Sequence, residues 1–239
     1  MTQFPVPAPS GACGCSVHSS APTSVQRRRF LAAGFAAGCA LAAGGVARAQ
    51  SSLAPDAALE RLMAGNARFV AKALNSFQED LAILKQGTFA KQEPFAAVLA
   101  CADSRIPVEL IFDQSIGQLF VARVAGNFAT AELIATLEYG AAVLGTRVIM
   151  VLGHESCGAV KAAIDGKPVP GQISALYRPL RAAVDQAGPD PEATAKANAR
   201  IQAALLATAS PVLAELIKKG ELKVVPAYYA LASGRVTLV

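Results

Sequence analysis

Short apolar runs alternate along this chain with longer stretches in which apolar residues recur at helical spacing. Four of the runs are almost continuously apolar, which is typical of strands buried on both faces of a sheet; they cover 95–100, 118–124, 148–152 and 222–229. A shorter run over 235–239 follows the Ser233–Gly234 turn and predicts an edge strand.

The stretches with helical spacing lie mostly between these runs. They cover 54–73, 80–86 with a stop at Gly87, 130–144 with a stop at Gly145, 173–186, and an Ala-rich stretch over 191–219 interrupted by Pro211. Strands that alternate with helices predict an α/β fold with a mostly parallel four-stranded sheet, one further short edge strand, and helices flanking it. No repeat or linker divides residues 50–239, which are expected to form one domain.

Residues 1–49 have a different pattern. Arg27-Arg28-Arg29 precedes a weakly apolar run over 30–46, and Ala47-Arg48-Ala49 follows it. This order predicts a signal peptide cleaved after Ala49, and a paired arginine followed by x-Phe-Leu resembles the twin-arginine export type. The alternatives are a retained membrane helix, which four glycines within the run disfavour, and lipidation at Cys39. We expect a bacterial protein that is periplasmic or otherwise exported.

Most of the net positive charge comes from the same segment. The formal net charge is +5, but four of the 22 basic residues and none of the 17 acidic residues lie in 1–49. The remainder is close to neutral, so it lacks the basic surface of a nucleic-acid-binding protein. No later stretch is long and charge-free enough to predict a membrane span after signal cleavage.

Cysteine and histidine residues are scarce beyond residue 49. Only Cys101, Cys157 and His154 remain, and they lie at the ends of the first and third strand runs. Ligands gather beyond the carboxyl ends of strands in parallel sheets, so the three side chains are expected to meet. Two thiolates and an imidazole predict one zinc ion, with the fourth position left for water or a carboxylate.

Asp103 and Arg105 lie two and four residues beyond Cys101. Asp103 is close enough to take the fourth position or to hydrogen-bond a zinc-bound hydroxide, and Arg105 could hold it off the metal as a bidentate partner. Taken singly, the cysteines could be core residues or a redox pair, and Asp103 with Arg105 a local ion pair. The joint pattern favours the zinc site.

The sequence Cys-x-Asp-Ser-Arg over 101–105, followed by His-x-x-Cys over 154–157, closely resembles the β-class carbonic anhydrases. Further segments are similar to the same family and extend the resemblance over nearly the whole chain after residue 49; they are 57–69, 119–127, 137–139, 151–154 and 225–239. The resemblance implies the fold of that family, a homodimer or a dimer of dimers, and reversible hydration of CO2 to bicarbonate and a proton by zinc-bound hydroxide.

The resemblance also implies residue roles. Cys101, His154 and Cys157 would bind zinc, Asp103 would orient the hydroxide, and Arg105 would restrain Asp103. Four further residues would bind substrate, partly across a dimer interface: Gln92 by a hydrogen bond, and Phe120, Ala125 and Tyr139 as the wall of a small apolar CO2 pocket. Plain core packing is the alternative for Phe120 and Tyr139.

Two other functions fit the same residues. One is hydrolysis of a CO2 analogue, carbon disulfide or carbonyl sulfide, at the same site. The other is a non-catalytic zinc-binding module, which would need neither Asp103, Arg105 nor Gln92. Because His154 is the sole histidine beyond residue 49 and is expected to bind zinc, the proton released on hydration must leave by a route other than a histidine.

Overall fold

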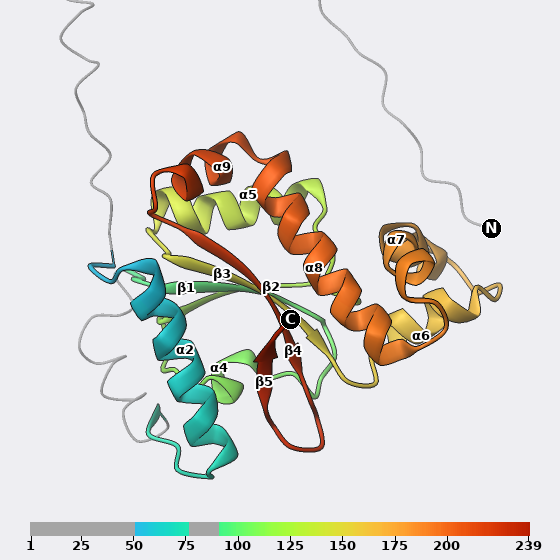
Figure 1. Cartoon of the computed structure of the whole chain (residues 1–239), viewed down its shortest axis with the longest axis horizontal. Helices are drawn as coiled ribbons and strands as arrows, with labels where there is room; N and C mark the ends of the chain where they lie inside the picture. The colour runs from blue at the N-terminus through green and yellow to red at the C-terminus, as the bar shows by residue number, and fades with distance from the viewer. Residues whose placement is uncertain (1–50, 77–90) are drawn as a thin grey trace, which may run out of the picture. The chain divides into compact units, whose positions relative to one another are not determined.

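A computed structural model describes residues 51–76 and 91–239 (Figure 1). The predicted signal peptide, the cleavage point after Ala49, the lipidation candidate Cys39 and the helix expected over 80–86 lie outside the described residues.

The described chain is built around one five-stranded sheet in the order β2-β1-β3-β4-β5. The strands are β1 (Ala96–Ala100), β2 (Leu119–Arg123), β3 (Val148–His154), β4 (Lys223–Tyr229) and β5 (Val236–Leu238). β2, β1, β3 and β4 are parallel to their neighbours, and β5 pairs antiparallel with β4. The predicted fold, four parallel strands plus a short edge strand, is confirmed.

Burial follows the position of each strand in the sheet. Every residue of β1 and β3 is buried, as expected for central strands covered on both faces. β2 differs from its prediction, because Leu119, Phe120 and Val121 are half-buried and Arg123 is exposed. β2 is an edge strand, and hydropathy alone does not distinguish an apolar edge from an apolar centre.

Two layers of helices cover the sheet (Figure 1). One layer is α2 (Pro55–Val70) with the short α4 (Val108–Ile111), and the other is α5 (Ala131–Glu138), α8 (Pro191–Ala209) and α9 (Pro211–Lys218). Alternate residues of β1 pack into the two layers: Ala96, Val98 and Ala100 share a core with α2, whereas Ala97 and Leu99 share one with α5, α8 and α9.

A third cluster covers the carboxyl ends of the strands. It includes Cys101 and Cys157 and joins them to α6 (Gly158–Asp165), α7 (Tyr177–Ala187) and Ala195 of α8. A 3-10 turn, η4 (Ile173–Leu176), leads into α7. The candidate metal ligands thus lie within a packed part of the molecule.

Local signals explain some of the helix boundaries. Asp190 caps α8 ahead of Pro191, and Ser210 caps α9 ahead of Pro211. The single helix expected over 130–144 is instead α5 followed by a π-helical turn, η3 (Tyr139–Val143). Within the described residues no single helix could span a membrane; α8 and α9, bent by 92°, satisfy length and composition only as a pair.

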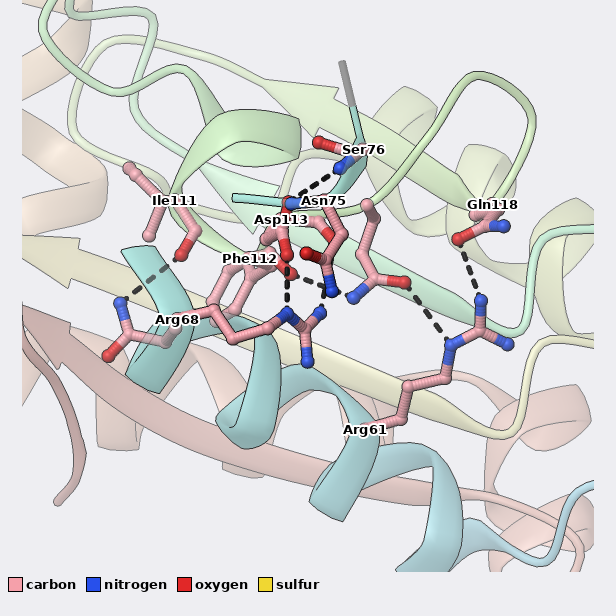
Figure 2. Close-up of polar contacts among 10 residues, drawn as sticks. Arg61, Arg68, Asn75, Ser76, Ile111, Phe112, Asp113 and Gln118 are labelled. Atoms are coloured by element: carbon pink, nitrogen blue, oxygen red, sulfur yellow. Dashed lines mark hydrogen bonds and ion pairs between the residues drawn. The ribbon is translucent and has the colours of Figure 1, made fainter. Parts of the chain in front are cut away.

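A buried carboxylate ties the end of α2 to the segment after α4 (Figure 2). Asp113 has a positive φ of 45° and accepts hydrogen bonds from the backbone N–H groups of Asn75 and Ser76. Arg68 of α2 donates from Nε to the same carboxylate, whose side chain is fully buried. The carboxylate thus satisfies two backbone N–H groups beyond α2 that no helix or strand pairs.

Candidate metal centre

The two metal-binding motifs meet because β1 and β3 are neighbours in the sheet. Ala100 is in register with Leu152, so Cys101 and His154 both lie at the carboxyl ends of adjacent strands. The candidate ligand atoms of Cys101, His154 and Cys157 all lie within 4.8 Å of one another, and all three residues are buried. The predicted convergence is confirmed.

His154 presents one nitrogen to this cluster. Its Nδ1 lies 2.9 Å from the backbone oxygen of Glu155, which fits an Nδ1–H donor. Its Nε2 is buried and has no hydrogen-bond partner within the part of the chain that the structure describes. An imidazole held in this tautomer by the Glu155 oxygen has the Nε2 lone pair free for a metal ion, an arrangement common for histidines that bind metals. The residues present therefore fit a metal ion.

The two thiols are a strongly interacting pair. The Sγ atoms of Cys101 and Cys157 are 4.0 Å apart. The contact between the two thiols lowers the pKa of the Cys101 thiol and, together with burial, raises the pKa of the Cys157 thiol. Two adjacent thiolates repel each other, so the second ionises fully only beside a cation. A Cys2His set of this kind suits zinc.

Backbone donors and an arginine hold Cys101 in place. The N–H of Gly126 donates to Cys101 Sγ at 3.3 Å. Arg123, the last residue of β2, donates from Nε to the Cys101 oxygen at 2.9 Å and from Nη2 to the Asp103 oxygen at 2.6 Å. We did not predict this role of Arg123 from the sequence. The available signal was its position at the carboxyl end of a strand adjacent to β1.

Asp103 and Arg105 form the predicted bidentate pair. Arg105 Nε lies 2.9 Å from Asp103 Oδ1, and Arg105 Nη2 lies 2.7 Å from Asp103 Oδ2. The Arg105 guanidinium also donates to the backbone oxygen of Ser156 at 3.2 Å, which joins the two metal-binding motifs. Arg105's hydrogen bonds hold the pKa of the Asp103 carboxyl far below its usual range, so Asp103 is ionised at neutral pH.

The four predicted substrate residues are separated. Ala125 lies in the loop that passes over Cys101, next to Gly126. Phe120 and Tyr139 contact each other with ring centroids 6.2 Å apart, but Phe120 is in register with Ala97, near the start of β1. Gln92 is exposed and precedes β1. Within one chain, Ala125 alone of these four adjoins the metal ligands.

Comparison with known proteins gives consistent matches. A family model described as carbonic anhydrase matches residues 96–236. "Carbonic anhydrase 2" of Mycobacterium tuberculosis is 34% identical over 192 residues, which are 77% of this chain and 92% of that protein. A carbonic anhydrase of Mycolicibacterium smegmatis is 45% identical over 122 residues, 48% of this chain and 57% of that protein.

Solved structures also share the fold. The β-carbonic anhydrase CafA of Aspergillus fumigatus superimposes with a TM-score of 0.62 at 25% identity, covering 76% of this chain and 90% of that one. The Coccomyxa β-carbonic anhydrase gives a TM-score of 0.59 at 26% identity, covering 68% of this chain and 81% of that one.

Proposed function

The chain belongs to the β-class carbonic anhydrase family, and on this premise we propose that it catalyses the zinc-dependent, reversible hydration of CO2 to bicarbonate and a proton. The observation that carries the proposal is the buried set of Cys101, His154 and Cys157 with the ionised Asp103 held beside it by Arg105.

Cys101 Sγ, His154 Nε2 and Cys157 Sγ would hold the zinc ion. When bound, zinc supplies Lewis-acid activation of a water molecule. This activation is weaker beside two thiolates than beside three imidazoles, so we expect activity to rise toward alkaline pH. Around it, Gly126 and Arg123 fix the side chain and the backbone of Cys101.

Asp103 is the proposed orienting residue for the nucleophile. A carboxylate with a lowered pKa stays an acceptor and holds a hydroxyl proton in a fixed direction throughout the working pH range. Arg105 occupies both carboxylate oxygens, and Asp103 is not part of the ligand set formed by Cys101, His154 and Cys157. This arrangement argues against a purely zinc-binding module, in which Asp103 would itself complete the metal coordination.

The substrate pocket is proposed to be completed by a second copy of the chain. Gln92 lies nine positions before Cys101, and the five residues of β1 between them span roughly 16 Å of extended strand, so Gln92 cannot reach the metal ligands of its own chain by a local turn. Tyr139 is 48% exposed beside the edge strand β2, and Ile116 and Val143 are also exposed. An apolar edge of this kind supports a homodimer, or a dimer of dimers, with Gln92, Phe120 and Tyr139 near the partner's site.

Stopped-flow CO2 hydration by the zinc-loaded protein tests the proposal. We expect hydration well above the buffer blank, lost in Asp103→Ala and kept in Asp185→Ala, a change to an exposed carboxylate of α7. Hydration no faster than the blank would remove the proposal. The same samples, given carbon disulfide or carbonyl sulfide, would reveal whether an analogue is the preferred substrate.

Export is a separate proposal that rests on the sequence of residues 1–49. We propose a twin-arginine-type signal peptide, cleavage after Ala49 and a periplasmic mature enzyme. Cell fractionation should find the enzyme outside the cytoplasmic membrane, beginning at Gln50 by mass spectrometry, and the double change Arg27→Lys, Arg28→Lys should retain it in the cytoplasm. An acylated Cys39 at the mature amino terminus would instead support lipidation.

A further inference from the structure

We propose that Asn198 of α8 is a positioning residue for the metal ligand Cys101 and acts through the backbone of Gly126. Asn198 is fully buried on a helix whose buried face is otherwise rich in alanine. A buried amide in such a place is costly unless it is hydrogen-bonded, so its partners indicate what it does.

The partners of Asn198 lead to the metal centre. Asn198 Nδ2 donates to the backbone oxygen of Gly126 at 2.9 Å. Its Oδ1 accepts from Gln202 Nε2 at 3.3 Å, and Gln202 Oε1 in turn accepts from the N–H of Ala129 at 2.9 Å. Two side chains one helical turn apart on α8 therefore hold the loop after β2 at two points, Gly126 and Ala129.

Gly126 is the residue that needs such an anchor. Its φ is +89°, and an added Cβ would lie 3.1 Å from Leu180 Cδ1 and 3.3 Å from Ala159 Cβ, so the position requires glycine. Glycine is also the residue whose backbone is least restricted by its own sterics. The bond from Asn198 to the Gly126 oxygen fixes the orientation of the residue whose N–H points at Cys101 Sγ, 3.3 Å away.

An N–H···S hydrogen bond to a ligating thiolate fixes the direction of the sulfur lone pairs and moderates the charge that the sulfur gives to the metal. Removing a hydrogen-bond partner of a metal ligand typically changes metal affinity or activity by roughly 10–100-fold. Because Cys101 is a zinc ligand in the proposed function, this role of Asn198 rests on that function. It concerns metal binding, which can be measured without turnover.

The test compares Asn198→Leu with Thr194→Val in the full chain. Thr194 is equally buried on α8, and its Oγ1 donates to the Gly188 oxygen, away from the metal ligands. Zinc affinity is measured by competition with a chromophoric chelator, and cobalt-loaded protein gives the thiolate-to-cobalt absorption band. We expect Asn198→Leu to weaken zinc binding roughly 10–100-fold and to shift that band, while Thr194→Val leaves both unchanged.

Wild-type zinc affinity and an unshifted band in a folded Asn198→Leu protein would overturn the proposal, and so would equal weakening in both variants. If Asn198→Leu does not fold, Asn198→Asp provides the same comparison, since it keeps the size and the acceptor for Gln202 but loses the donor to Gly126. A wild-type protein that binds zinc tightly and does not hydrate CO2 would contradict the proposed function and leave the role of Asn198 intact.

Discussion

Arg105 holds Asp103 through both carboxylate oxygens, at 2.9 and 2.7 Å, and its own backbone N–H donates to the same carboxylate at 2.9 Å. The pair spans only two residues of sequence, yet the third bond of the guanidinium reaches Ser156, next to Cys157. One side chain thus fixes the orientation of the carboxylate and the distance between the two metal-binding motifs.

Arg105→Lys should lower kcat/KM for CO2 hydration by roughly 10–100-fold, the usual effect of changing a partner of a metal-site residue. A lysine keeps the positive charge but cannot hold both oxygens in a planar fork, so Asp103 becomes free to rotate. Stopped-flow hydration measures the loss. Arg181→Lys, in the exposed Arg181–Asp185 pair, is the matched control and should retain full activity. Equal activity in the two variants would contradict the restraining role.

Asp113 should contribute stability that depends on pH. Burial acts to raise the pKa of its carboxyl, but hydrogen bonds from Ser76 and Arg68 outweigh burial, so the pKa lies below its ordinary value. A lowered pKa means that the stabilisation is present above the unfolded value, about 3.9, and is lost as pH falls through the folded value. Asp113→Asn should lower the free energy of unfolding at pH 7 by about 1.5–3 kcal/mol.

Urea unfolding at pH 7 and at successively lower pH checks this expectation. The difference between the wild type and Asp113→Asn should shrink as the pH falls below about 4, because protonation removes the same charge as the substitution. Asp185→Asn, at an exposed site, should follow the wild type at every pH. A difference that stays constant down to the lowest pH would show that charge on Asp113 contributes nothing.

The meeting of Cys101 with His154 could be predicted because it depends on two strong local patterns. The runs that became β1 and β3 are continuously apolar and fully buried, and the motifs follow them directly. Parallel pairing then aligns the two carboxyl ends. The contact between Arg105 and Asp103 is equally local, which explains why their spacing predicted it.

Other features depend on contacts that no local pattern encodes. The π-helical turn at Tyr139–Val143 and the four-residue helix α4 leave the apolar spacing almost unchanged, so the sequence predicted one longer helix and no α4. Asn198 belongs to an Ala-rich helix, where its polar side chain could equally face solvent. The packing of α8 over the metal centre brings the Asn198 side chain within hydrogen-bond distance of the Gly126 oxygen.

Zinc should protect the two cysteines from oxidation. The Sγ atoms lie 4.0 Å apart, so a small side-chain movement brings Cys101 and Cys157 within bonding distance once the metal is removed. Chelator-treated protein given oxidised glutathione should lose both thiols to an intramolecular disulfide, with reduced glutathione as the product. Peptide mapping identifies the pair, because the other three cysteines lie in residues 1–49.

The zinc-loaded protein is the control, and it should keep both thiols free over the same period. Formation of the disulfide at equal rates with and without zinc would contradict ligation by the two sulfurs. The outcome also bears on export, since metal loading before transport would deliver the enzyme to an oxidising compartment with its thiols already protected.

CO2 hydration should depend on buffer concentration. His154 is the sole histidine beyond residue 49, and its ring is fully buried with Nδ1 occupied by the Glu155 oxygen and Nε2 facing the sulfurs. No histidine of this domain is therefore free to carry the proton that each turnover releases, and we expect a buffer molecule with a pKa near 7 to accept it. At saturating CO2, kcat should rise with buffer concentration and then level off.

A buffer too bulky to enter the site is the control, and it should give a lower plateau of kcat than a small buffer of equal pKa. A kcat independent of both buffer size and concentration would place the proton route in water chains or another side chain of the protein.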